Sequence, residues 1–497
     1  MRRIIVLLMN LLVCFYSEAQ QWFIEHAHKD NEDVVFITGD MSGIYNYALG
    51  YRYDKTSDKL SPYALCVNQD GDYRSKEIQY EGEDGSFNSA IGIGDENIFV
   101  TAYCTNDKDL GLYEKMWIAI LDPDLDVLYE NYISVERPYL TFGYTAHVVV
   151  NKNNEFVVLA MVTESVTKKV MQNCDFVFYK FDDKCNLLST GYLGNTSHNS
   201  DVSDFVYFPN LDRYAILGRA INVTGENSVS YVDEDFNFVS CMPIDDPNNY
   251  PNYIRPYFVS VGHLYDDNSI LMSMQTKNTM SDAEYCPVVI KFDEEMNVLD
   301  SIKFERYGFT DYVSQYNSIA YVDSKTIYVS SFEVEDAFVA SPNTASVYLI
   351  DDDLNMLGKV AFELGYFMNI LYIQPTIDGG CIIQAYYENG SDKIAVIGKL
   401  DVDDFIDETV VDEYRKEIAV ECYPNPVSSI LNINIDNKID RNIRVIIYDI
   451  SGGRCMDNYY NTEGNVLSLD LSLLKRGVYC CNIICDDNIT TEVFVKR

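Results

Sequence analysis

A hairpin-like motif recurs along the chain at intervals of 50 to 60 residues, and this repeat restricts the fold more than any other feature of the sequence. In each copy two short apolar runs flank a cluster of acidic and amide residues, as in VVIKFDEEMNVLDSIKF from Val288 to Phe304. The first acids of the clusters are Asp70, Asp122, Asp182, Asp233, Asp293, Asp351 and Asp401. A repeat of this length indicates one supersecondary unit stacked several times.

Each unit contains four candidate strands. In the sixth unit they are Asn317–Val322, Thr326–Glu333, Ala345–Ile350 and Leu357–Glu363, bounded by polar turn residues. Four strands per unit in about seven units predict an all-β chain built as a seven-bladed β-propeller, because a single blade cannot bury both of its faces. The pattern resembles the divergent bacterial seven-bladed propellers, over about Val34–Val411.

The acidic clusters allow two interpretations. Asp293, Glu295 and Asn297 stand at alternate positions, as in the first half of a calcium loop. Such a loop also needs a glycine and a later bidentate glutamate, which this stretch lacks. Asp and Asn close tight turns through bonds to their own backbone. We therefore favour hairpin turns and expect no cofactor, with calcium as the alternative.

Charge and the N-terminal residues indicate an exported protein. The 77 Asp and Glu outnumber the 37 Lys and Arg, giving a formal net charge of −40. Such a chain repels phosphate backbones, so we expect no nucleic-acid partner. Arg2 and Arg3 precede the apolar run Ile4–Leu12, and small residues end at Ala19, which is typical of a signal peptide over 1–19. No later run is long enough for a transmembrane anchor.

The repeat ends at Val411, so we expect the propeller over 20–411, a charged linker over 412–420 and a separate domain over 421–497. That last domain contains six or seven alternating strands, which predict a small Ig-like β-sandwich. Its YPNP, YDISG and GVY stretches and its basic end resemble the type A C-terminal sorting domain of the type IX secretion system. The matching residues are Pro424, Asn425, Pro426, Asp449, Gly452, Gly477, Tyr479 and Lys496.

This resemblance implies a route and a partner. The type IX secretion machinery would recognise the domain, carry the protein across the outer membrane and remove the domain. The cargo would then be released or attached to surface lipopolysaccharide, so the expected location is extracellular or on the outer-membrane surface. The route does not say what the propeller does.

Three segments that join one unit to the next combine an arginine with several tyrosines. Their residues are Arg137 with Tyr139 and Tyr144, Arg255 with Tyr253 and Tyr257, and Arg306 with Tyr307 and Tyr312. An arginine fork holds a carboxylate, and tyrosines offer stacking faces and hydroxyls. The alternative is that each arginine stacks on tyrosine and pairs with nearby acids to stiffen its loop.

These observations favour a non-catalytic module that binds a glycan or a protein. The enzyme alternative is a polysaccharide lyase or glycosidase on the same scaffold, and a third possibility is a structural surface-layer component. His147 and His263 fall in first strands of their units, where they would line the centre of the ring or pack in the core. No serine-hydrolase elbow, zinc-protease or phosphate-loop motif occurs in the sequence.

Overall fold

The computed structural model describes residues 22–26, 31–81, 84–94, 96–105, 115–134, 140–164, 174–193, 202–219, 227–244, 260–277, 285–304, 311–314, 316–333, 344–363, 367–389, 392–406, 420–435, 442–449, 454–461, 466–472, 474–485 and 488–497. The chain divides into two compact units, Met1–Ile406 and Asp407–Arg497. The described residues form β-strands and one short helix, α1 (Asp403–Ile406), which confirms the all-β prediction.

Seven sheets form the blades of the first unit. Blade 1 comprises β2 (Glu32–Ser42), β3 (Tyr45–Asp54), β4 (Lys59–Val67) and β5 (Tyr73–Glu77). Blade 2 comprises β6 (Asp84–Gly92), β7 (Ile98–Thr105), β8 (Lys115–Leu121) and β9 (Val127–Ser134). Blade 3 comprises β10 (Leu140–Val150), β11 (Phe156–Glu164), β12 (Cys174–Phe181) and β13 (Leu187–Leu193). Blade 4 comprises β14 (Val202–Phe208), β15 (Arg213–Arg219), β16 (Asn227–Asp233) and β17 (Phe238–Pro243).

Blades 5 to 7 complete the ring. Blade 5 comprises β18 (Ser260–Leu264), β19 (Ile270–Lys277), β20 (Tyr285–Phe292) and β21 (Val298–Lys303). In blade 6 both β22 (Asp311–Val313) and β23 (Ile319–Asp323) pair with β24 (Thr326–Glu333), which is followed by β25 (Thr344–Ile350) and β26 (Met356–Glu363). Blade 7 comprises β27 (Met368–Pro375), β28 (Cys381–Asn389), β29 (Asp392–Leu400) and, from the start of the chain, β1 (Trp22–Glu25).

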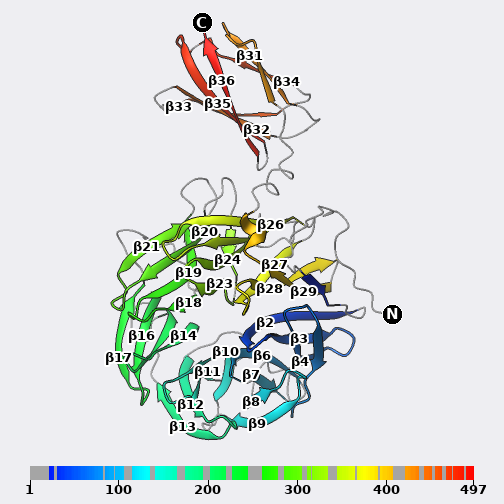
Figure 1. Ribbon diagram of the computed structural model, residues 1–497, viewed down its shortest axis with the longest axis vertical. Helices are drawn as coiled ribbons and strands as arrows, with labels where there is room; N and C mark the ends of the chain where they lie inside the picture. Colours follow the sequence, from blue (N-terminus) through cyan, green and yellow to red (C-terminus); the bar gives the residue numbers. More distant parts are fainter. Residues whose placement is uncertain are drawn as a thin grey trace. The chain divides into compact units, whose positions relative to one another are not determined.

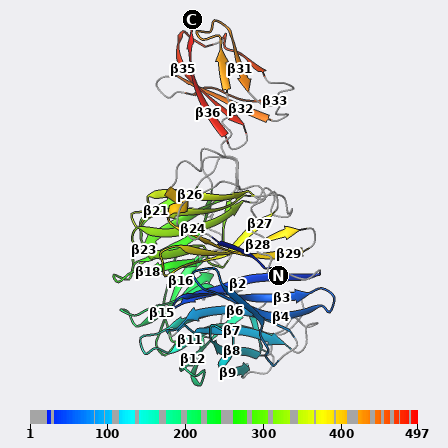
Figure 2. The same cartoon turned by 45° about the vertical axis from the view of Figure 1, so that its right-hand side comes forward.

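The innermost strands β2, β6, β10, β14, β18, β23 and β27 surround the middle of the ring (Figure 1). Strand β1 pairs antiparallel with β29, so the N-terminal strand closes the propeller beside blade 1 (Figure 2). The predicted hairpin at Asp401 is therefore wrong. Its backbone N–H is accepted by the Asp404 carboxylate at 2.7 Å and the chain enters α1, because the fourth strand of blade 7 is supplied from elsewhere.

Hydrophobic clusters fill the interfaces between neighbouring blades. The cluster between blades 2 and 3, for example, stacks Phe99 on Phe156 with ring centroids 4.2 Å apart. Successive side chains along a strand point to opposite faces of the sheet, so each blade contributes to two such clusters. Blade-to-blade packing therefore supplies the core.

The turns that join the third and fourth strands are hereafter the outer turns, and they confirm the hairpin interpretation. The Asp293 carboxylate accepts hydrogen bonds from the N–H of Glu295 at 3.0 Å, the N–H of Asn297 at 2.7 Å and the Asn297 amide at 2.8 Å. The first outer turn departs by two positions, because Asn68 rather than Asp70 makes these contacts, to the N–H of Asp70 and of Asp72.

The second unit is a sandwich of two sheets. One sheet comprises β30 (Val420–Tyr423), β31 (Ile430–Ile435) and β34 (Val466–Asp470), and the other comprises β33 (Arg454–Asn461), β32 (Asn442–Asp449), β35 (Gly477–Cys485) and β36 (Asn488–Lys496). Both sheets contribute buried residues, such as Ile433, Ile447 and Ile483, to one core. Within the part of the chain that the structure describes, no helix is long and apolar enough to cross a membrane.

Candidate functional site

Most of the predicted arginine and tyrosine residues lie outside the described residues. These are Arg137, Tyr139, Tyr253, Arg255, Tyr257, Arg306 and Tyr307. Tyr144 lies in β10, but its side chain is not described. Tyr312 lies in β22, where its half-buried ring stacks on Phe332 with centroids 5.9 Å apart.

The described strand ends establish from which edge of the ring these segments depart. Ser134 at the end of β9 pairs with the first residue of β8, so it lies at the end of blade 2 opposite its outer turn. Leu140, the first residue of β10, pairs with the last residue of β11 and therefore lies at the same edge. The strands that flank 245–259 and 305–310 run in the same directions as β9 and β10, although Ser260 at the start of β18 pairs with Ser273 in the middle of β19. All three segments thus leave from the edge opposite the outer turns.

Polar side chains connect the innermost strands, whose inner edges, among the described residues, pair with no other strand apart from a single bridge between Asn317 and Tyr372. Backbone groups at such an edge still need hydrogen bonds. The Asp40 carboxylate of β2 accepts the N–H of Met41 at 2.8 Å and, from blade 2, the N–H of Gly92 at 2.8 Å. Asp204 of β14 repeats this arrangement with the N–H of Phe205 and with a backbone N–H of blade 5, both at 2.7 Å.

Other side chains make comparable contacts around the ring. The Ser89 hydroxyl of blade 2 accepts the N–H of Val148 at 3.1 Å, and the Asn317 amide of blade 6 donates to the carbonyl of Ile373 at 2.8 Å. The Tyr372 hydroxyl of blade 7 donates to the backbone carbonyl of Gly39 at 2.8 Å. Each contact runs from one blade to the next, so these side chains hold the inner strands in register.

Burial controls protonation in this inner ring. It raises the pKa of Asp40, and it raises the pKa of Asp204 to about 6, while the backbone hydrogen bonds lower both pKa values by less. Burial, and then the nearby Asp40 and Asp204 charges, raises the pKa of Tyr372. The inner ring therefore combines two carboxyl groups with a neutral phenol.

His147 projects from β10 beside Asp204, as its predicted place in a first strand allows. Its side chain is 23% exposed, and its Nδ1 atom lies 3.9 Å from Asp204 Oδ1. Burial lowers the pKa of His147 to about 4, so the imidazole is neutral at pH 7 and the contact is not an ion pair. Its Nε2 atom has no hydrogen-bond partner in the structure. His263, by contrast, stacks on Tyr321 with centroids 3.6 Å apart.

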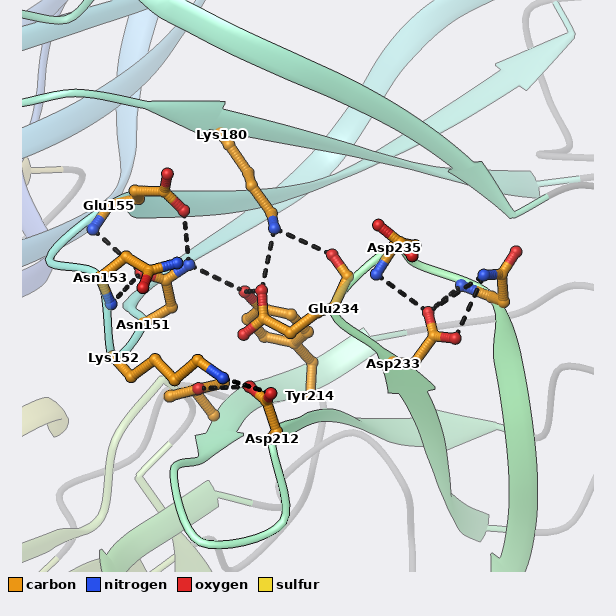
Figure 3. A network of polar contacts seen from close by, with 12 residues as sticks. Asn151, Lys152, Asn153, Glu155, Lys180, Asp212, Tyr214, Asp233, Glu234 and Asp235 are labelled. Carbon is orange, nitrogen blue, oxygen red and sulfur yellow. Dashed lines mark hydrogen bonds and ion pairs between the residues drawn. The ribbon is translucent and has the colours of Figure 1, made fainter.

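The outer turns carry a second set of polar contacts, shown in Figure 3 for blades 3 and 4. Lys180 of β12 donates to the backbone carbonyl of Glu234 at 2.9 Å and to its carboxylate at 3.0 Å. The Tyr214 hydroxyl donates to the same carboxylate at 3.4 Å and accepts from the Asn151 amide at 3.3 Å. Lys152 and Asp212 form an ion pair nearby.

Equivalent contacts occur at other blade interfaces. Lys291 of blade 5 lies 3.3 Å from an Asp352 oxygen of blade 6, and the Asn131 amide of blade 2 donates to the carbonyl of Cys185 at 2.8 Å. The acidic outer turns therefore accept hydrogen bonds from the preceding blade. Among the described residues no group of three or more His, Cys, Asp and Glu is arranged to hold a metal ion.

In the second unit, the described motif residues converge although they are far apart in the sequence. Asn425 Oδ1 accepts the N–H of Val495 at 2.9 Å, and the buried Lys496 ammonium donates to the carbonyl of Ser428. Gly477 pairs with Lys496 across β35 and β36. The YPNP segment, the GVY strand and the basic end thus form one cluster.

Tyr479 fixes the other side of this cluster. Its hydroxyl donates to the carbonyl of Lys475 at 2.9 Å, and its ring stacks on Phe494 with centroids 5.5 Å apart. Asp449 is the last residue of β32, with a side chain that is not described, and Gly452 lies outside the described residues. The described motif residues hold the final strand in place.

Comparison with protein families decides what this unit is. Residues 421–497 match the family of secretion system C-terminal sorting domains. These residues are a type IX secretion sorting domain. The sorting domain implies interaction with the type IX secretion machinery and export to the cell surface or the extracellular space. A search of curated proteins gave no match for the chain.

Several solved structures are distantly similar to the chain. The acylaminoacyl peptidase of Pyrococcus horikoshii is 9% identical, with a TM-score of 0.40, over 82% of this chain and 58% of the peptidase. An apocarotenoid oxygenase variant of Synechocystis is 10% identical, with a TM-score of 0.37, over 77% and 94%. An alpha-L-arabinofuranosidase of Fusarium graminearum is 8% identical, with a TM-score of 0.40, over 64% and 93%. The chain thus spans less than two thirds of the peptidase.

Proposed function

We propose that the propeller is a non-catalytic binding module, which type IX secretion delivers to the outside of the cell. Its ligand, a glycan or a protein, binds at the edge of the ring opposite the outer turns. The residue chemistry favours an acidic glycan, because an arginine fork pairs with a carboxylate and tyrosine rings stack on sugar faces.

The observation that carries this proposal is the common edge from which the segments 135–139, 245–259 and 305–310 depart. Because the flanking strands end at one edge, we expect Arg137, Arg255 and Arg306 to lie on the same side of the ring. At the opposite edge, some turn carboxylates are used in contacts between blades, as in the bonds from Lys180 to Glu234, and others within their own turn, as in the bonds that Asp293 accepts.

The two inner-ring carboxylates also favour binding over the carboxylate chemistry of a glycosidase. A glycosidase needs carboxyl groups that are available to the substrate. Both oxygens of Asp40 and both oxygens of Asp204 accept backbone N–H groups, which assigns these carboxylates to the connection between blades.

The test combines a glycan array with an assay for release of reducing ends, both on the full chain. We expect binding of an acidic glycan without product release. Arg255→Ala should weaken binding by about 1.5–3 kcal/mol, the range for a hydrogen bond to a charged group, which is about 10–150-fold in affinity.

The matched control is Asp293→Ala, which removes turn contacts on the opposite edge and should leave affinity unchanged. Release of reducing ends would support the enzyme alternative. Equal affinity of Arg255→Ala and the parent chain would show that this segment does not contact the ligand.

A further inference from the structure

Gln275 in β19 is an unusual buried residue. Its side chain is 0% exposed, and neither its Oε1 nor its Nε2 atom has a hydrogen-bond partner in the structure. An amide in a protein interior normally satisfies several of its four hydrogen bonds. Each buried polar group that stays unpaired costs about 1–3 kcal/mol. Gln275 therefore requires an explanation.

Three other blades place apolar or aromatic residues at the corresponding position. The sixth residue of the second strand is Tyr103 in blade 2, Met161 in blade 3 and Tyr386 in blade 7. All three are buried and pack in the cluster shared with the next blade. At this place the interface between blades 5 and 6 is polar instead.

Blade 6 presents two hydroxyl groups to the same interface. Ser331 and Ser346 pair directly across β24 and β25, and each is 1% exposed. Ser331 lies two residues after Val329, and Ser346 lies two residues before Tyr348. Residues two apart on a strand share a face, and Val329 and Tyr348 belong to the cluster between blades 5 and 6, so both serines lie on the face that is turned toward blade 5. The Ser346 hydroxyl, like the Gln275 amide, has no hydrogen-bond partner in the structure.

The polar patch continues toward the inner strands with its hydrogen bonds made. Ser273 lies two residues before Gln275 on the same face of β19, and its hydroxyl lies 3.0 Å from the Ser260 hydroxyl and in contact with that of Ser318. The unpaired groups thus lie at the end of the patch that is farther from the outer turns.

That end lies at the edge proposed for ligand binding. Gln275 and Ser331 are each the third residue from the end of a second strand, and Ser346 is the third residue of the third strand that follows. These strand ends adjoin the same edge from which 305–310, with Arg306, departs.

We propose that this interface is a binding slot for a neutral, hydroxyl-bearing group at the end of a glycan, with Gln275 as the anchor and Ser331 and Ser346 as further hydrogen-bonding groups. The inference rests on the proposed function and names the part of the ligand that enters the ring. An amide offers both a donor and an acceptor, which suits neighbouring hydroxyls of a sugar. The described side chains of the slot carry no charge, and a buried unpaired charge would be costly.

The experiment uses Gln275→Met, which restores the residue type found at Met161, in the full chain. Affinity for the glycan selected on the array is measured by calorimetry, and thermal stability is measured alongside. We expect a loss of at least tenfold in affinity with an unchanged or raised melting temperature. Ser346→Ala, a smaller change, should lower affinity in the same direction and serves if Gln275→Met fails to fold.

Thr101→Val is the matched control, because Thr101 is also fully buried with an unpaired hydroxyl, but at the interface between blades 2 and 3. It should leave affinity unchanged. If Gln275→Met and the parent chain bind the glycan equally, the slot is refuted and the proposed function stands.

A second measurement reports on the slot without the array. The side-chain amide signals of glutamine are recorded by NMR, the pair lost in Gln275→Met is assigned to Gln275, and a panel of neutral methyl glycosides is added. A shift of that pair supports the slot even where the array is negative, in which case only the arginine segments lose their role. A negative array and an unmoved signal overturn both proposals.

Discussion

Phe236 tests how the outer turns contribute to stability. It is the fourth residue of the turn that begins at Asp233, with a φ of 64°, a conformation that usually favours glycine. Its side chain is nevertheless only 5% exposed and stacks on Phe178 of blade 3, with centroids 4.4 Å apart and planes 6° from parallel. The strained backbone at Phe236 therefore allows its ring to pack against the neighbouring blade.

Phe236→Gly separates the two effects. Glycine removes the cost of the left-handed conformation, about 1–2 kcal/mol. It also removes an aromatic side chain from an interface, which costs about 3–5 kcal/mol, and it adds freedom to the unfolded chain. We expect the free energy of unfolding to fall by about 2–4 kcal/mol, so packing outweighs strain.

The assay is denaturant unfolding followed by tryptophan fluorescence, because the only two tryptophans of the chain, Trp22 and Trp117, lie in blades 7 and 2 of the propeller. Phe236→Leu is the control, since it keeps φ positive and retains an apolar group, and it should lose less than the glycine variant. A Phe236→Gly protein as stable as its parent would refute the reasoning.

Two further predictions follow from the inner ring and the sorting domain. The pKa of His147 is lowered from 6.5 to about 4 in the folded chain, so its contribution to stability is present above pH 6.5 and is lost as pH falls toward 4. The pKa of Asp204 is raised from 3.8 to about 6, so its contribution to stability is present at low pH and is lost as pH rises through 6. Melting temperatures between pH 6.5 and 4.5, relative to the parent chain, should therefore improve with falling pH for His147→Gln and worsen for Asp204→Asn, and slopes of the same sign would contradict the assignment. Deletion of 421–497 should leave the propeller in the periplasm, as followed by cell fractionation, and normal appearance outside the cell would refute the sorting role.

The repeat predicted most of the propeller because its signals are local. Alternating apolar residues and turn-forming acids define strands and outer turns within about 20 residues, as the stretch around Asp293 demonstrates. The closure of the ring was missed, because β1 pairs with a strand more than 360 residues away and nothing in the local pattern of Trp22–Glu25 indicates that partner.

For the candidate sites too, local motifs are predictable from the sequence and contacts between distant residues are not. Motif residues such as Asn425 and Lys496 were recognised from the sequence, but their contact with the opposite end of the domain required the structure. Asp40 and Asp204 were not predicted as inner-ring residues, because a carboxylate inside a strand usually indicates a solvent-exposed face. Their role depends on backbone N–H groups of the next blade, which no sequence pattern reports.

The first outer turn explains why the closing interface differs from the others. At its fourth position, where later turns place buried apolar residues such as Leu125 and Met296, it has Gly71 with a φ of 82°. A Cβ at Gly71 would lie 2.9 Å from the Trp22 ring, whose Nε1 donates to the carbonyl of Gln69 at 3.0 Å. Trp22 thus takes the place that a turn side chain fills at other interfaces. The glycine leaves room for the strand that closes the ring, and the missing apolar contact is supplied by the N-terminal strand itself.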